Sequence, residues 1–429
     1  MTMTTLMSML PLEMVNKILS FLEISDILNF AKTCKEWQKL AVEIYFRPSL
    51  FKLTGYIGPE DGSDAETVLT KFKATKGRVL IFSQDKCNAV VIDLLDSKFK
   101  QNITLGVKKR FLRKEYFWLN GFLLGGKILL HGENDFTNSE YICVLGQSEL
   151  ILHFPRTERG GASRVCKVDD STLVRLGGSI GVLGTFLAID IIHFDPTNAA
   201  NPFNVEKGPD FPHEIYGHAI IKSPGGKLYV IGGCYDTEDD IYVETNKTWI
   251  IDPDNGYSII EGPKLKSARS YHSVGIIESG GKYPHIIVVG GVSPNNNNPD
   301  HECCDFHEDE GNTKFKKSSE YLDPISNEWK CINKDLEQPI RDGAMISSPC
   351  QNSVFLIGGQ IRKELIGEDY SSKEIFELRK WTYNAPPESD QYMSWSPLKH
   401  DLSCGVKFVV QIPYDFSLST IERNGKEST

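Results

Sequence analysis

The sequence has no long hydrophobic run and no excess of positive charge. No stretch approaches the roughly 20 uninterrupted apolar residues that cross a bilayer as a helix, and the opening MTMTTLMSML lacks the basic segment of a secretory leader. The formal net charge of −10 disfavours a nucleic acid or an anionic membrane as partner. We therefore expect no membrane and no nucleic acid as partners. We also expect the 10 scattered cysteines to be reduced thiols in the cytoplasm or nucleus.

The common motifs of catalysis are also missing. The chain has no Gly-rich phosphate loop, no GxSxG elbow and no HExxH zinc motif. His272 is the best-placed single histidine, and we expect it to pack at the start of a repeat unit rather than act as a base. We predict a protein without catalytic activity and without a cofactor.

The bulk composition is that of an ordinary folded protein. Apolar residues make up 40% and charged residues 24% of the 429 residues, which excludes global disorder. The length suits two or three domains, or one large repeat fold with a small appendage.

The first fifty residues predict three short amphipathic helices. Pro11 suits a first helical position. Apolar residues follow it at helical spacing, at Val15, Ile18, Leu19 and Leu22. Ser25 can cap a second helix with Ile27, Leu28 and Ala31 facing inward, and Thr33 with Glu36 forms a capping box for a third. A module of this size buries too little apolar surface to be stable alone, so it must pack against another part of the chain or dock onto a partner protein.

This segment resembles the F-box. The resemblance rests on Leu10-Pro11, Glu13, Ile18-Leu19, Phe21-Leu22, Asp26-Ile27-Leu28, Cys34 and Trp37. It implies binding to the Skp-type adaptor of a cullin-RING ubiquitin ligase. The positions where F-boxes contact that adaptor are occupied by Leu10, Pro11, Ile18, Leu19 and Leu22. Ile27 replaces the usual leucine, a swap of similar volume. The alternative is a helical segment that only packs, in which Cys34 and Trp37 would still be core residues.

Beyond residue 75 the sequence changes to short β-rich runs that end in paired glycines. These runs are TLVRLGG, KLYVIGG, HIIVVGG and SVFLIGG. Their second glycines are Gly178, Gly233, Gly291 and Gly359, so the unit repeats after roughly 55 to 70 residues. A period near fifty with four strands per unit is typical of a propeller blade.

A second marker is an Asp-Pro turn after a strand. It occurs at Asp195-Pro196, Asp252-Pro253 and Asp323-Pro324, and Trp329 follows the last of these. Together with the glycine pairs, this pattern resembles the kelch repeat. Phe194, Ile251 and Leu322 stand where that repeat usually has tyrosine.

The blade count follows from two weaker runs, GRVLIFSQ and GGKILLHG, which bring the inner strands to six. We expect GVKFVVQIP (405–413) to be the missing innermost strand of the first blade, closing the ring. Six blades is the prediction and seven the alternative. The predicted fold is mainly β, a kelch-like propeller preceded by a small all-α F-box. Its predicted parts are a tail at 1–9, the F-box at 10–51, a linker at 52–75, the propeller at 76–420 and a tail at 421–429.

Three long loops follow glycine pairs, at 234–247, 292–318 and 360–373, and should lie on one face of the ring. Two are acidic, which favours a protein substrate with a basic segment, although solvated loops would look the same. The predicted substrate-binding residues are Asp236, Asp239, Asp240, Glu302, Asp305, Glu308 and Arg362. Zinc binding by His301, Cys303, Cys304 and His307 is disfavoured, because adjacent cysteines do not have the usual ligand spacing. No metal is therefore expected.

The sequence thus predicts the substrate-recognition subunit of an SCF-type ubiquitin ligase. The alternative is a kelch-type interaction scaffold without a ligase role. In the first case the propeller has no chemistry of its own and raises the effective concentration of the substrate near the conjugating enzyme.

Overall fold

The computed structural model describes most of the region after residue 64 and a few residues before it. The described residues are 27, 31, 35–46, 64–75, 77–83, 88–94, 100–105, 116–134, 139–146, 151–154, 163–178, 187–198, 200–236, 242–277, 285–294, 313–332, 335–336, 338–347, 353–363, 371–374, 378–383, 393–398, 406–414 and 416–421.

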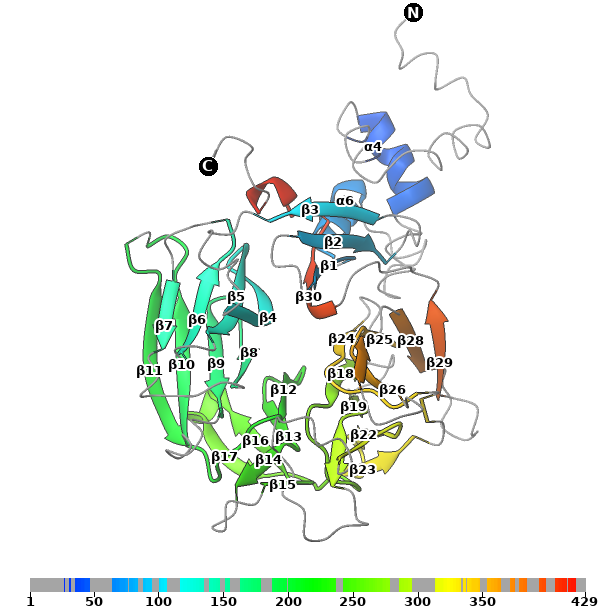
Figure 1. The fold of residues 1–429 in the computed structure, drawn as a ribbon. Helices are drawn as coiled ribbons and strands as arrows, with labels where there is room; N and C mark the ends of the chain where they lie inside the picture. The colour runs from blue at the N-terminus through cyan, green and yellow to red at the C-terminus, as the bar shows by residue number, and fades with distance from the viewer. Residues whose placement is uncertain are drawn as a thin grey trace, which may run out of the picture.

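Six four-stranded antiparallel sheets in this part of the chain are arranged around a central axis (Figure 1). The first sheet has the order β3-β2-β1-β30, from β1 (Arg78–Ser83), β2 (Asn88–Asp93), β3 (Lys100–Thr104) and β30 (Val406–Ile412). The second consists of β4 (Tyr116–Leu124), β5 (Lys127–Asn134), β6 (Ser139–Val144) and β7 (Ile151–Phe154). The third consists of β8 (Arg164–Lys167), β9 (Thr172–Leu176), β10 (Ala188–Phe194) and β11 (Phe203–Asp210).

The other three sheets share one plan, in which a two-stranded hairpin is inserted between the second and third strands. The fourth sheet consists of β12 (Ala219–Lys222), β13 (Leu228–Ile231), β16 (Thr248–Asp252) and β17 (Ser258–Glu261). The fifth consists of β18 (Ser273–Ile277), β19 (His285–Val289), β22 (Ser319–Asp323) and β23 (Glu328–Cys331). The sixth consists of β24 (Ala344–Ser347), β25 (Ser353–Ile357), β28 (Leu378–Tyr383) and β29 (Met393–Leu398).

The ring closes by joining the two ends of the chain in one sheet. Five sheets each come from one continuous stretch of chain, whereas the first combines β1–β3 with β30. Leu80 pairs with Val410 and Ile81 with Val409 in antiparallel register. The prediction that the last strand completes the first sheet is confirmed. Because β30 covers the inner edge of β1, that edge is not left open.

Alternating side chains explain why the strands are apolar throughout. Leu80 and Val91 pack toward the β4–β7 sheet, whereas Val79 and Ile92, on the opposite side of their strands, pack toward the β24–β29 sheet. Each of the six junctions between neighbouring sheets has such an apolar cluster. A strand between two packed sheets is buried on both sides, so it reads as a continuous hydrophobic run.

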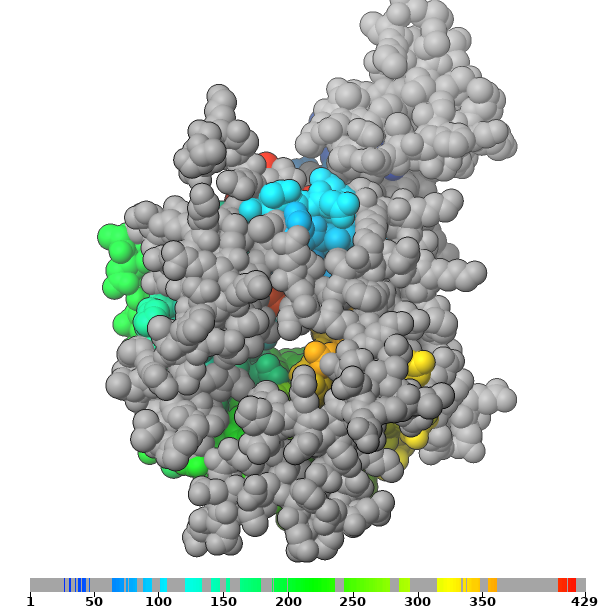
Figure 2. Space-filling model, viewed as in Figure 1, coloured from blue at the N-terminus to red at the C-terminus, as the bar shows by residue number. Residues whose placement is uncertain are grey.

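The predicted inner strands lie second from the axis, at β1, β5, β9, β13, β19 and β25. The innermost strands are linked by side-chain donors that reach the main chain of a neighbour. The Ser347 hydroxyl donates to the Ile276 carbonyl oxygen (2.7 Å), and the Gln411 amide donates to the Ser347 carbonyl oxygen (2.8 Å). The centre of the ring is hollowed (Figure 2).

Each glycine pair has a steric reason. Gly232 and Gly233 have φ values of 56° and 100°, a conformation that costs residues with a Cβ atom free energy. The Gly233 N–H donates to the carbonyl oxygen of Arg269 (2.8 Å), and a Cβ atom on Gly232 would lie 2.4 Å from that same oxygen. The Gly177-Gly178 and Gly290-Gly291 pairs meet the next sheet in the same way. The pairs therefore let neighbouring sheets approach closely.

The Asp-Pro turns also lie where the sequence predicts them. β10 ends at Phe194, β16 at Asp252 and β22 at Asp323. The Asp323 carboxylate accepts a hydrogen bond from the backbone N–H of Ile325 (2.9 Å). Trp329 is fully buried, and its indole N–H donates to the Pro263 carbonyl oxygen (3.0 Å).

Helices lie beside the first sheet, outside the ring (Figure 1). They are α4 (Lys35–Ala41), the π-helical turn η1 (Val42–Phe46) and α6 (Ala65–Ala74). Two short 3-10 turns are described elsewhere in the chain, η4 (Pro253–Asn255) and η5 (Leu418–Thr420). In the described part of the chain, no helix has the length and apolarity needed to cross a membrane.

The predicted linker at 52–75 contains α6, a helix that the sequence analysis did not identify. The Asp64 carboxylate caps it by accepting from the Thr67 N–H (2.7 Å). Val68, Leu69 and Phe72 are buried. A second departure is Ile421, the first residue of the predicted tail, which is buried in the cluster between the first two sheets.

Candidate functional site

The predicted adaptor-binding residues lie outside the described part of the chain. They are Leu10, Pro11, Ile18, Leu19 and Leu22. The described residues of this module are buried where the helical pattern predicts it, with Ile27 at 0% and Ala31 at 3% exposure. Ala41, Val42 and Phe46 are also fully buried. These apolar side chains are therefore shielded from solvent.

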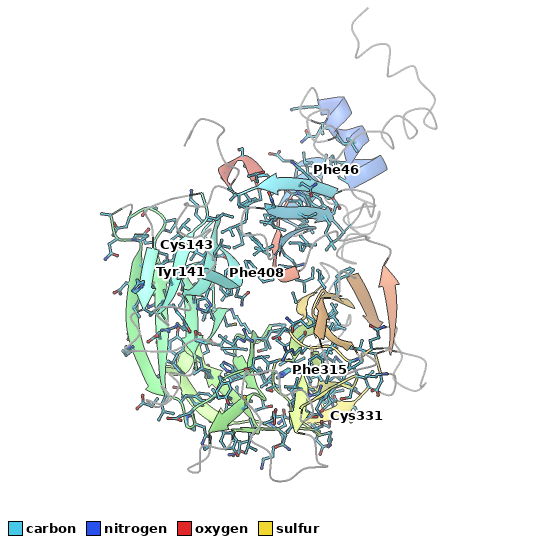
Figure 3. All side chains as sticks on the ribbon, viewed as in Figure 1. Phe46, Tyr141, Cys143, Phe315, Cys331 and Phe408 are labelled. Atoms are coloured by element: carbon cyan, nitrogen blue, oxygen red, sulfur yellow. The ribbon has the colours of Figure 1, made fainter. Side chains whose placement is uncertain are left out.

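An aromatic stack joins the helices to the ring. Phe46 (labelled in Figure 3) packs against Phe72 of α6 with ring centroids 4.9 Å apart. Phe72 in turn stacks on Tyr414, just after β30, with centroids 4.5 Å apart and planes 9° from parallel. The Tyr414 hydroxyl donates to the buried Asp93 carboxylate of β2 (2.9 Å). Tyr414 thus connects the helices to the sheet in which the two chain ends meet.

Gly77 provides the space for this ring. A Cβ atom at Gly77 would lie 2.3 Å from the Tyr414 ring, so no larger residue fits without displacing it. The Arg78 guanidinium lies 5.4 Å from the ring centroid and also donates to the Tyr414 carbonyl oxygen. The junction therefore links α6, the start of β1, β2 and the segment after β30.

A second candidate site is the face that bears the three hairpins. The hairpins are β14–β15 (Cys234–Asp236 and Tyr242–Glu244), β20–β21 (Val292–Pro294 and Thr313–Phe315) and β26–β27 (Gln360–Lys363 and Ser371–Glu374). Each follows a glycine pair. The segment that enters each of these three sheets bridges to the hairpin of the same sheet, through Tyr216–Cys234, Ser270–Val292 and Arg341–Gln360. These bridges confirm that the hairpins and the entry segments share one face.

Most of the predicted substrate-binding residues lie outside the described part of the chain. These are Asp239, Asp240, Glu302, Asp305 and Glu308, and the disfavoured zinc group of His301, Cys303, Cys304 and His307 lies outside it as well. The backbones of Asp236 and Arg362 are described: they pair with Tyr242 and Ser372 within their hairpins. Within the described residues, no cluster of three or more His, Cys, Asp or Glu side chains could hold a metal ion.

The entry segments also form a linked rim around the axis. Gly217, Tyr271 and Asp342 occupy equivalent places, and all three have left-handed φ values, at 60°, 52° and 53°. The Tyr271 N–H donates to the Gly217 carbonyl oxygen (2.7 Å), and the Asp342 N–H donates to that of Tyr271 (2.9 Å). These main-chain bonds hold three successive entry segments at fixed distances from one another.

Arg341 is a cation of this face that is held in place from several sides. Its guanidinium lies 5.0 Å from the centroid of the Phe315 ring (labelled in Figure 3). Its Nε–H donates to the Gln360 side-chain oxygen at 3.0 Å. The backbones of Arg341 and Gln360 exchange two hydrogen bonds, of 3.0 and 2.8 Å. The Arg341 side chain therefore bridges the β20–β21 and β26–β27 hairpins while remaining 34% exposed.

Two buried arginines form three ion pairs within the ring. Arg269 contacts Glu320 (2.6 Å) and donates to the Gly290 carbonyl oxygen (2.9 Å). Arg175 contacts Glu140 at 2.7 Å and Asp190 at 2.9 Å, and all three side chains are fully buried. The sequence analysis did not identify Glu140 or Glu320. The signal was available, because each glutamate belongs to the same Ser-Glu-Tyr tripeptide at the start of a third strand.

Glu140 is the carboxylate of this network whose pKa is most clearly shifted. Burial alone would raise the pKa of Glu140, but the Arg175 charge and hydrogen bonds from His131 and Ser163 outweigh it and hold the pKa at about 2. The carboxylate is therefore ionised although it is fully buried. Such a group links neighbouring sheets and is inaccessible to a substrate.

Two histidines at the rim are buried as neutral side chains. His218 and His272 immediately precede the successive innermost strands β12 and β18, and are 1% and 7% exposed. Burial, with a smaller effect of Arg164, lowers the pKa of His218 to about 3, and burial followed by the Arg269 charge lowers the pKa of His272 well below its usual value. The interpretation of His272 as a packing residue fits this burial. His272 packs closely against Gly291, where an added Cβ atom would lie 2.9 Å from the Cβ atom of His272.

Comparison with known proteins supports both parts of the architecture. Residues 7–48 match the F-box domain family. A solved structure described as "Structure of YjhT" is similar in fold to the chain, with a TM-score of 0.51 and 13% sequence identity, covering 76% of this chain and 97% of that chain. No curated protein sequence matches the chain. The chain therefore combines an N-terminal F-box domain with a mainly β, propeller-like fold.

Proposed function

We propose that this protein is the substrate-recognition subunit of an SCF-type ubiquitin ligase. In this proposal the F-box docks onto a Skp-type adaptor, and the ring, taken as six kelch-type blades, binds the protein to be modified. The observation that carries the proposal is the F-box match at residues 7–48, on a chain whose helices are joined by the Phe72–Tyr414 stack to a closed ring.

The stack matters because a ligase receptor has to hold its substrate at a defined distance from the conjugating enzyme. A flexible connection would spread the substrate over a large volume and lower its effective concentration at the site of transfer. Phe46, Phe72 and Tyr414 provide continuous aromatic packing from the helical module to the ring. We infer that the protein acts as a receptor without chemistry of its own, in the cytoplasm or the nucleus.

The test is capture of the Skp-type adaptor by the full chain. We expect stable co-purification with the adaptor, and loss of at least tenfold in capture for the double variant Leu10→Ala, Pro11→Ala. The matched control is Lys35→Ala with Lys39→Ala, which changes two exposed residues of α4 and should leave capture intact. If the wild-type chain captures no adaptor, the ligase role is wrong and the interaction scaffold becomes the better proposal.

For the substrate, we propose that the acidic residues of the 234–247 and 292–318 loops attract a protein with a basic segment, through long-range electrostatic steering. Reversing the charges of Asp239, Asp240 and Glu302 should weaken capture of that protein more at low salt than at high salt. Capture that is unchanged at both salt concentrations would leave these residues as solvated loop positions.

A further inference from the structure

We propose that Arg341 is an anion anchor on the hairpin face, which binds a carboxylate or phosphate group presented by a peptide segment of the substrate. This inference rests on the proposed function as a receptor and adds to it the class of group that the receptor recognises. It concerns one described contact on the hairpin face and does not involve the acidic residues of the 234–247 and 292–318 loops.

The first argument is the preorganisation of the side chain. The Arg341 backbone is held by two hydrogen bonds to Gln360, its Nε by the Gln360 side chain, and its guanidinium plane by the Phe315 ring. An arginine normally loses considerable side-chain entropy when it binds a ligand, and a guanidinium that is already held in place loses less. This side chain is therefore built to bind without reorganising.

The second argument is which nitrogen atoms the protein uses. The hydrogen bond to Gln360 occupies Nε. The Asp342 carboxylate lies 3.6 Å from the same Nε, beyond ordinary hydrogen-bond distance. Among the described residues, none accepts a hydrogen bond from Nη1 or Nη2. Two parallel N–H groups on one edge of a guanidinium match the two oxygen atoms of a carboxylate or phosphate.

The third argument is the charge of the neighbouring segment. Phe315 is followed by Lys316 and the exposed Lys317. The Lys316 carbonyl oxygen accepts a hydrogen bond from the Ile340 N–H (3.2 Å), which places these lysines on the strand end next to Arg341. The Lys316 ammonium group bonds to the Ser267 hydroxyl. Lys316 and Lys317 thus add positive charge beside Arg341, where the acidic residues are Asp342 and Glu374, the latter opposite Gln360 in the β26–β27 hairpin.

The position of Arg341 suits recognition of a peptide. It precedes Asp342, one of the three rim residues linked around the axis, and it lies between two hairpins. A segment lying over the rim would pass both hairpins and present a side chain or terminus to the guanidinium. A planar guanidinium supported by an aromatic ring distinguishes an anionic side chain from a neutral one through paired hydrogen bonds.

The test uses the full chain bound to its adaptor and immobilised random dodecapeptide libraries. Three libraries have the central position fixed as glutamate, phosphoserine or serine. We expect the glutamate or the phosphoserine library to be captured at least tenfold better than the serine library, and the better of the two identifies the anion. Equal capture of all three libraries, or capture of none, would overturn the proposal.

Variants separate the anchor from general positive charge. Arg341→Met keeps apolar packing on Phe315 and should abolish the preference for the anionic library. Arg341→Lys keeps the charge but loses the paired geometry, and should retain less than a third of the preference. Lys317→Met removes an exposed neighbouring charge and is the matched control, which should change the preference less than twofold. Equal losses for Lys317→Met and Arg341→Met would show nonspecific attraction instead.

Folding and ligase assembly are checked on the same samples. Thermal unfolding and adaptor capture of Arg341→Met should match the wild type, and if that variant does not fold, Arg341→Lys and competition of wild-type capture by inorganic phosphate decide the question. The Leu10→Ala, Pro11→Ala variant, used without adaptor, should keep the library preference. A wild-type chain that captures no adaptor but keeps the library preference would refute the ligase role and leave the anchor standing.

Discussion

Tyr414 stacks on Phe72 with their ring centroids 4.5 Å apart, although 341 residues of the chain lie between the two. This contact connects the helices of the N-terminal module to the strand that closes the ring. Because the Tyr414 hydroxyl also donates to Asp93 of β2, this one side chain contacts both α6 and the first sheet.

We expect Tyr414→Ala to destabilise the protein by about 3–5 kcal/mol, as large-to-small substitutions of buried aromatic residues do. Tyr414→Phe keeps the stack and loses only the hydrogen bond to the buried Asp93 carboxylate, so it should cost less, about 1.5–3 kcal/mol. Thermal unfolding measures both, and hydrogen exchange of α6 should rise in the alanine variant alone. The control is Ile325→Ala, an exposed position. Equal stability of Tyr414→Ala and this control would mean that the stack is not a structural joint.

The glycine pairs make a prediction with a matched control inside the same chain. Gly232 and Gly256 have nearly equal φ values, 56° and 59°. A Cβ atom at Gly256 would meet nothing within 4 Å, whereas one at Gly232 would lie 2.4 Å from the Arg269 carbonyl oxygen. Gly256→Ala should therefore cost about 1–2 kcal/mol for the left-handed backbone alone. Gly232→Ala should cost about 1–3 kcal/mol more, because the neighbouring sheet must move. Chemical denaturation compares the two, and equal losses would contradict the close-approach explanation.

The buried Glu140 predicts a response to acid. Its folded pKa of about 2 lies below its ordinary value of 4.5. A carboxylate with a lowered folded pKa contributes stability that is fully present above pH 4.5 and is lost as the pH falls toward 2. Glu140→Gln leaves Arg175 without this partner and should cost about 3–5 kcal/mol at neutral pH. The variant should also show a shallower loss of stability between pH 4.5 and 2.

The control for this prediction is Glu261→Gln. Glu261 forms an exposed pair with Lys264 at 3.8 Å, which should contribute at most about 1 kcal/mol. Urea unfolding at a series of pH values tests both variants. If Glu140→Gln loses stability between pH 4.5 and 2 as steeply as the wild type does, another carboxylate accounts for the acid sensitivity.

His218 predicts an effect at higher pH. Its folded pKa of about 3 lies below its usual 6.5, so the unfolded chain binds a proton that the folded protein does not. Stability from this group is present above pH 6.5 and is lost as the pH falls from there toward 3, by about 1.4 kcal/mol per pH unit for one proton. His218→Leu removes this titration and should flatten the stability profile between pH 6 and 4.

His193→Gln is the control, since His193 is 45% exposed. Differential scanning calorimetry at pH 7, 6, 5 and 4 measures the profile. An unchanged slope in His218→Leu would show that the neutral, buried histidine is not the source of the acid sensitivity. Neither ring nitrogen of His218 has a hydrogen-bond partner within the described residues, so the apolar substitution leaves no described polar group without its partner.

The repeat and its closure could be predicted from the sequence because they depend on local signals. Paired glycines after a β-rich run mark a strand end with left-handed backbone, and each pair lies there in the structure. The final strand could be placed because GVKFVVQIP has strand propensity and no partner after it. The helix α6 could have been predicted too, from Asp64 as a cap followed by Val68, Leu69 and Phe72, but a short apolar pattern in a presumed linker is easily overlooked.

The candidate anion anchor could not be predicted in this way. In the sequence, Arg341 is one of 47 basic residues and lies 26 positions from Phe315 and 19 from Gln360. Only the pairing of entry segments with hairpins brings these three side chains together. The sequence directs attention to the acidic loops because charge runs are visible in one dimension, whereas a guanidinium held by two distant side chains is not.

The F-box, the repeat unit and the strand that completes the first sheet follow from local sequence, because helical spacing, glycine conformation and strand propensity act over a few residues. Which residues meet across the ring depends on the tertiary structure. It placed Tyr414 on Phe72, Glu140 beside Arg175, and Arg341 between two hairpins. The physical reason is that closing a ring brings together segments hundreds of residues apart, and packing between sheets then determines which side chains are buried and which remain available to a partner.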